Sequence, residues 1–149
     1  MGNHEYLMLE YHRTGDPALL PLLRHLGIDA TLDSYGVGGP RYLQDLLFLP
    51  KEHRRLLHSL LPYWETDDYI FVHAGLEPGV SLKNNELSVL CESRNFHLDH
   101  YDHGKIVVFG HTPFDLPYVT PTRIGIDTGA VYGNLLTAVE LPARVFHHA

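Results

Sequence analysis

The chain is poor in cysteine, in net positive charge and in long apolar runs. Its 149 residues include a single cysteine, Cys91, which excludes an internal disulfide framework and fits the reducing cytoplasm where we expect the protein. The formal net charge is −7, which argues against a groove that neutralises nucleic-acid phosphates. No apolar run approaches the roughly 18 residues of a membrane-spanning helix, and the first residues carry no secretory signal, so no membrane partner is expected.

The composition that remains is that of a globular protein rich in histidine. Apolar residues make up 44% of the chain and charged residues 19%, which excludes intrinsic disorder. The 12 histidines outnumber the 11 lysines and arginines, and histidine is both a metal ligand and a proton-transfer group. Since neither an internal repeat nor a flexible linker interrupts the sequence, we expect one domain over residues 1–149.

Helical patterns dominate the first half of the chain. Leu7, Met8 and Tyr11 share one face of a helix predicted over residues 4–13. Asp16 has the chemistry of a helix N-cap and is followed by a proline, which predicts a second helical stretch over residues 17–26. Two more are expected at residues 40–49 and 51–61.

The second half has the apolar, β-branched and aromatic runs of buried strands. Strands are predicted at residues 69–72, 106–109, 124–127 and 135–141, with one helix at 86–94 between the first two. Helices followed by strands predict an α/β or α+β layered fold.

Histidines follow two of these strands directly. His73 comes after the run at 69–72, and His111 comes one residue after the run at 106–109, each beside a glycine or small residue. A third group, Asn3 and His4, opens the first helix and could offer an amide oxygen and an imidazole. Taken singly, a structural histidine or a helix cap is the commoner explanation of each.

Four strings in this order give the chain a resemblance to a known family. They are residues 2–5 (Gly-Asn-His-Glu), 72–76 (Val-His-Ala-Gly-Leu), 109–113 (Phe-Gly-His-Thr-Pro) and 126–133 (Ile-Asp-Thr-Gly-Ala-Val-Tyr-Gly). Over essentially all its length the chain resembles the calcineurin-like metallophosphoesterases, and within them the bacterial and phage serine/threonine protein phosphatases. The resemblance implies a sandwich of two mixed sheets flanked by helices.

The resemblance also implies a metal site. Asn3, His73 and His111 match the family's ligands for one metal of a two-metal centre, and nitrogen and oxygen ligands suit manganese, iron or zinc. Two such ions clamp a phosphoryl group and activate a water molecule. The implied substrate is a phosphorylated protein or a small phosphoester.

Three further residues match family positions that act on the substrate. His4 matches the histidine that protonates the leaving oxygen, and Tyr132 matches an aromatic hydroxyl near the phosphate. Arg94 matches a phosphate-binding arginine, although Glu92 and Ser93 stand where the family often has Trp-Ile.

Two of the family's motifs, which normally precede the Gly-Asn-His-Glu string, have no counterpart here. We therefore expect the C-terminal part of a phosphatase domain, without the N-terminal strands, that binds metal weakly and hydrolyses little by itself. An unpaired sheet edge would favour self-association. The stretch 98–103 contains two Asp-x-His-like groups, but no apolar strand precedes it, and we expect it to be a solvated loop.

Three functions remain open from the sequence. The leading one is hydrolysis of phosphoesters by a protein-phosphatase-like two-metal site. A second is hydrolysis of dinucleoside tetraphosphates in the symmetrical manner, because those enzymes share the Gly-Asn-His and His-Ala-Gly strings. The third is a non-catalytic remnant that binds or completes a partner.

Overall fold

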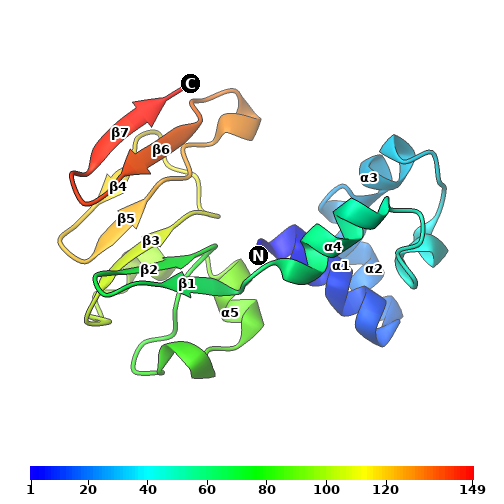
Figure 1. The fold of residues 1–149 in the computed structure, drawn as a ribbon, viewed down its shortest axis with the longest axis horizontal. Coiled ribbons are helices and arrows are strands. Elements are labelled where there is room, and N and C mark those ends of the chain that lie inside the picture. Colours follow the sequence, from blue (N-terminus) through cyan, green and yellow to red (C-terminus); the bar gives the residue numbers. More distant parts are fainter. The chain divides into compact units, whose positions relative to one another are not determined.

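The chain divides into a helical unit and a sheet unit. The computed structural model describes residues 1–149, with one compact unit formed by residues 3–61 and the other by residues 1–2 together with 62–149. In Figure 1 the labels α1 to α4 belong to the helical unit, and every strand belongs to the sheet unit. No helix is both long enough and apolar enough to cross a membrane.

The helical unit consists of short helices joined by tight turns. Its α-helices are α1 (Asn3–Thr14), α2 (Leu20–His25), α3 (Ile28–Ser34) and α4 (Lys51–Ser59), and its 3-10 turns are η1 (Pro17–Leu19) and η2 (Pro40–Leu43). The N-cap expected at Asp16 is present, because its Oδ1 accepts the Ala18 N–H at 2.9 Å. The helix expected over 40–49 is limited to the 3-10 turn η2, and α3 was not expected.

A leucine-rich core holds these helices together. The face predicted for α1 is confirmed, since Leu7, Met8 and Tyr11 are all buried. The same cluster takes buried apolar residues from each later segment, namely Leu23, Ile28, Leu32, Leu43, Leu46 and Leu49. Because these side chains bury their surface against one another rather than within single helices, tertiary packing stabilises helices as short as α2 and α3.

A mixed five-stranded sheet forms the centre of the other unit. Its strands lie in the order β1-β2-β3-β5-β4, with bounds Tyr63–Glu65, Tyr69–Val72, Ile106–Phe109, Arg123–Gly125 and Tyr118–Val119 in that order. The central strands β2, β3 and β5 run parallel, and the edge strands β1 and β4 pair antiparallel with their neighbours. The predictions at 69–72 and 106–109 match β2 and β3 residue for residue.

The connection from β2 to β3 supplies the unit's helical segments: η3 (Leu82–Asn84), α5 (Leu87–Glu92) and η4 (Phe96–Leu98). Ile70 pairs with Val107 and Val107 with Arg123, so these three side chains lie on one face of the sheet. Phe96 of η4 contacts Phe109 edge to face, with ring centroids 5.2 Å apart, so the connection packs on that same face.

A second, two-stranded sheet completes the sheet unit. β6 (Thr137–Glu140) and β7 (Val145–His148) form an antiparallel pair that follows the 3-10 turn η5 (Ala130–Tyr132). The expected mixed α/β class is confirmed. The second sheet contains antiparallel strands alone, and the prediction of a single domain over 1–149 stays a prediction.

Candidate functional site

His73 and His111 meet at the carboxyl ends of two neighbouring parallel strands. The Gly110 N–H donates to the His73 carbonyl at 2.8 Å, which extends the β2–β3 pairing one step beyond the strands. The ring centroids of His73 and His111 lie 5.1 Å apart, and His73 Nε2 lies 3.3 Å from His111 Nδ1. Residues 38 positions apart are therefore brought into contact by strand topology, at the sheet edge where α/β proteins bind ligands.

The backbone at His111 adopts an uncommon conformation. Its φ is +65°, and the Thr112 N–H donates to the Gly110 carbonyl at 2.7 Å, which closes a three-residue γ-turn centred on His111. A γ-turn with positive φ is rare and strained. Such strain at a residue with a side chain costs about 1–3 kcal/mol and is concentrated at functional sites.

The next parallel strand brings Asp127 to the same edge. A Cβ added to Gly110 would lie 3.5 Å from the His73 carbonyl oxygen and 3.6 Å from the Asp127 Cβ, so three strand ends crowd around this glycine. Asp127 Oδ1 accepts the Gly129 N–H at 3.0 Å, and its carbonyl accepts the Phe114 N–H at 3.0 Å. Asp127 thus fixes the turns on either side of the strand ends.

The segment after His73 is held in place by α5 and η4. The Ala74 N–H donates to the Leu90 carbonyl at 2.8 Å. A Cβ added to Gly75 would lie 2.6 Å from the Phe96 Cβ, well inside van der Waals contact. Glycine at position 75 therefore lets Phe96 close over the chain directly after His73.

The spacing of the two imidazoles suits a pair of ligands to one metal ion. Ligand nitrogens about 2.0–2.1 Å from a tetrahedral ion lie roughly 3.4 Å apart, and the His73 and His111 nitrogens are 3.3 Å apart. No group of three or more His, Cys, Asp or Glu side chains gathers as a metal site anywhere in the chain. The histidine pair thus fits a divalent ion as part of a ligand set, and it carries no carboxylate to balance the ion's charge.

Arg94 adjoins the His111 turn through its backbone. The Thr112 hydroxyl donates to the Arg94 carbonyl at 3.2 Å, and the Arg94 side chain is exposed. The pKa of Glu92 is raised by burial, an effect that the positive charge of Arg94 opposes. An acidic residue thus stands beside the arginine that the resemblance assigns to phosphate.

Tyr132 lies in η5, just beyond the strand end that carries Asp127. It is 80% exposed. A Cβ added to Gly129 would lie 3.6 Å from both Tyr132 Cδ2 and Pro113 Cβ, so the Tyr132 ring and the segment after His111 flank the same glycine. The Tyr132 side chain is accessible to a substrate.

Asn3 and His4 open α1 in the helical unit. Asn3 is 8% exposed and His4 is exposed. His4 lines a cavity in that unit together with its neighbour Glu5. The structure therefore brings two of the three predicted metal ligands together within the sheet unit and places the third at the start of the helical unit.

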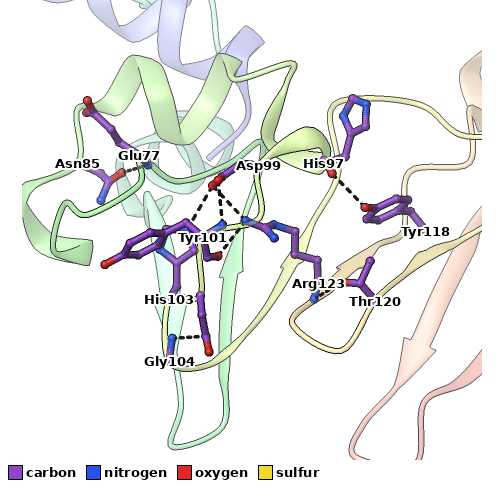
Figure 2. A network of polar contacts seen from close by, with 11 residues as sticks. Glu77, Asn85, His97, Asp99, Tyr101, His103, Gly104, Tyr118, Thr120 and Arg123 are labelled. Carbon is purple, nitrogen blue, oxygen red and sulfur yellow. Dashed lines mark hydrogen bonds and ion pairs between the residues drawn. The ribbon is translucent and has the colours of Figure 1, made fainter.

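The solvated loop expected at 98–103 is wrong for Asp99 and His103. Figure 2 shows both in a polar network around Arg123 of β5, whose Nη2 donates to Asp99 Oδ2 and to the Tyr101 carbonyl, each at 3.0 Å. The Arg123 guanidinium also stacks over the Phe96 ring at 4.6 Å. A charged residue directly before the apolar strand predicted at 124–127 was the sequence signal for this network, because a buried guanidinium needs a carboxylate partner.

Burial lowers the pKa of His103 within this network. The positive charge of Arg123 acts in the same direction, and the negative charges of Asp99 and Asp102 oppose both. Together these effects favour the neutral form of His103 more than in a free histidine. The network lies in the connection that covers the sheet rather than at the strand ends, and it joins this connection to β5.

No family profile matches the chain. Its curated relatives include two bacterial proteins that are both named asymmetrical bis(5'-nucleosyl)-tetraphosphatase PrpE. The protein from Oceanobacillus iheyensis is 47% identical over 47 residues, which cover 32% of this chain and 19% of the relative. The protein from Geobacillus sp. is 26% identical over 133 residues, which cover 78% of this chain and 53% of the relative.

A crystal structure provisionally described as a diadenosine tetraphosphatase superposes with a TM-score of 0.66 over 99% of this chain and 65% of the other, at 20% identity. The two chains share a fold. The present chain spans about half the length of the Geobacillus relative. Both curated relatives are named for the asymmetrical reaction, whereas the alternative drawn from the sequence was the symmetrical one. Neither is named a protein phosphatase, the function that the sequence analysis placed first.

Proposed function

We propose that this chain is part of a metal-dependent phosphoester hydrolase that cleaves dinucleoside tetraphosphates asymmetrically. The observation that carries the proposal is the His73–His111 pair at the ends of β2 and β3, with its nitrogens at ligand spacing. The asymmetrical tetraphosphatases among the relatives supply the substrate class. A small phosphoester, rather than a phosphoprotein, is the substrate that these names support.

In this proposal His73 and His111 bind one divalent ion of the manganese, iron or zinc type, and the resemblance adds Asn3 as a third ligand. When bound, such an ion would supply an activated water molecule and charge neutralisation at the phosphoryl group. The strained turn at His111 fixes the direction of its imidazole, so the pair is organised before the ion arrives. Three neutral ligands offset none of the ion's charge, and we therefore expect weak binding by this chain alone.

Three residues act on the substrate in this proposal. Arg94 binds the phosphoryl oxygens through its guanidinium fork as negative charge develops on them. The Tyr132 hydroxyl donates a hydrogen bond to the same group. His4 gives a proton to the departing phosphate oxygen, which reduces the negative charge that this oxygen gains as the P–O bond breaks.

The first test of the proposal is metal binding, measured by titration calorimetry with Mn²⁺ and Zn²⁺. We expect His73→Ala and His111→Ala each to weaken binding about tenfold or more, since each removes one of three ligands. His100→Ala is the matched control, because His100 is exposed on a loop outside the pair. Equal affinity in all four proteins would contradict the proposed site.

The second test is product analysis with diadenosine tetraphosphate and metal. Asymmetrical cleavage yields ATP and AMP, whereas symmetrical cleavage yields two molecules of ADP. Turnover that gives ATP and AMP and is lost in His73→Ala supports the proposal. Faster turnover of a phosphoserine peptide would favour the protein-phosphatase alternative, and metal binding without any turnover would favour a binding role.

A further inference from the structure

A cavity of about 180 Å³ opens beside the start of α1, wholly within the helical unit. Its wall comes from α1, α2, the turn between α2 and α3, and α3. The residues that line it are His4, Glu5, Met8, Leu23, Leu26, Ile28 and Thr31. None of these residues except His4 has a role in the function proposed above.

The cavity combines an apolar floor with a polar rim. Met8, Leu23 and Ile28 are 8%, 1% and 8% exposed, so the floor is part of the unit's leucine-rich core. His4 and Thr31 are exposed at the rim and offer an imidazole and a hydroxyl. Small-molecule sites have this composition, in which apolar surface supplies affinity and a few polar groups fix orientation.

The volume suits one planar ring system. An apolar cavity of about 150 Å³ is enough to hold benzene, and this cavity is somewhat larger and opens to one side. A flat, largely apolar base gains from burial against Met8, Leu23 and Ile28. A bare sugar gains little there, because the floor has no partners for its hydroxyl groups.

We propose that this cavity binds the nucleobase of a nucleotide. The inference rests on the proposed function for its substrate class, because the dinucleoside tetraphosphates named there carry such a base.

The cavity also separates substrate classes. A phosphoserine leaves as a small aliphatic alcohol with no ring to bury, whereas every nucleotide leaving group carries a base. The cavity thus favours ligands that carry a base over phosphoesters without one.

The test is methyl NMR on the whole chain without metal, with adenosine as the probe and ribose as the control. We expect adenosine to shift the methyl signals of Leu23, Leu26 and Ile28, and ribose at the same concentration to leave them unchanged. No shift with adenosine, or equal shifts with both, would overturn the inference. The same holds for shifts confined to Leu49 and Leu57, which line an adjoining cavity that shares Glu5, Met8 and Thr31 with this one.

Two substitutions on α3 sharpen the test. Thr31→Phe places a ring in the cavity mouth and should weaken adenosine binding about tenfold or more. Ala30→Phe adds a comparable ring at an exposed neighbour that does not line the cavity, and binding should stay within about twofold of the original chain. Equal binding by both variants would count against the cavity, and the adenosine–ribose comparison on the unmodified chain decides the matter if Thr31→Phe does not fold.

This readout needs neither metal nor turnover, so the two proposals fail separately. Adenosine binding in the cavity with no metal affinity at His73 and His111 would leave this site standing and remove the hydrolase. Metal-dependent cleavage without shifts at the cavity methyl groups would do the reverse.

Discussion

Gly75→Ala is the substitution whose effect the structure specifies most closely. The new methyl carbon would lie 2.6 Å from the Phe96 Cβ and 2.7 Å from its Cγ. Carbon atoms in contact prefer about 3.5–4.0 Å, so one of the two segments must move by about 1 Å. Phe96 cannot yield cheaply, because it is 3% exposed and lies between the Phe109 ring and the Arg123 guanidinium.

We expect Gly75→Ala to lower the free energy of unfolding of the sheet unit by about 1–3 kcal/mol, the usual cost of overpacking. Since position 75 follows His73 by two residues, the same displacement moves a proposed metal ligand. Metal affinity should therefore fall together with stability.

The chain has one tryptophan, Trp64 of β1, so its fluorescence during urea unfolding follows the sheet unit and not the helical unit. Gly38→Ala is the control for the substitution itself, because nothing lies within 4 Å of its added Cβ and its φ is not positive. Gly38 lies in the helical unit, so the unfolding that Trp64 reports should be unchanged in this variant. A loss below about 0.5 kcal/mol in Gly75→Ala would refute the packing argument.

Three further predictions use the same fluorescence assay. His111→Gly should be more stable than His111→Ala by about 1–3 kcal/mol, because glycine relieves the positive-φ strain that alanine retains; equal stabilities would contradict the strained turn. Arg123→Met should cost about 3 kcal/mol, because it leaves Asp99 facing a partly buried site without its cation; an unchanged urea midpoint would be inconsistent with the network. The folded chain holds the pKa of His103 below its ordinary value of 6.5, so the unfolded chain binds more protons as the pH falls through that value, and stability present above pH 6.5 is lost below it. His103→Gln should therefore flatten the plot of unfolding free energy against pH between about pH 7.5 and 5.5. An unaltered slope would assign the pH dependence to another group.

The central strands could be predicted because their sequences are continuous runs of apolar, mostly β-branched or aromatic residues. Such runs are typical of strands in the interior of a parallel sheet, and every residue of β2 and β3 is buried or half-buried. The edge strands β1 and β4 span three and two residues, which is too short for any period to show. Their conformation comes from pairing with β2 and β5 rather than from their own sequences.

In the helical unit, too, some elements depend on tertiary packing rather than on their own sequence. α3 has a sequence with aspartate, threonine and serine among its seven residues, which are weak helix formers. It forms because Ile28 and Leu32, one turn apart, both enter the leucine-rich core. Residues 40–49 have better helical periodicity, yet Leu46 adopts a φ of +56° and is fully buried, so core packing overrides the local preference.

At the candidate site, the contact between His73 and His111 could be predicted from the sequence. The γ-turn centred on His111 could not. Each histidine ends a recognisable parallel strand, and parallel strands place their ends together. The positive φ of His111 is a conformation that no local sequence rule assigns to histidine. Likewise, the burial of Asp99 depends on Arg123, which lies 24 residues later in the chain.

The separation of 24 residues between Asp99 and Arg123 affects the order in which the sheet unit assembles. The segment around Asp99 and Tyr101 obtains its cationic partner from β5, so during synthesis it stays unsecured until residue 123 has emerged. Arg123 therefore joins the loop to the sheet only after β5, the third parallel strand, has docked. The connection that supports His73 thus reaches its final rigidity at the moment when the strand leading to Asp127 is in place.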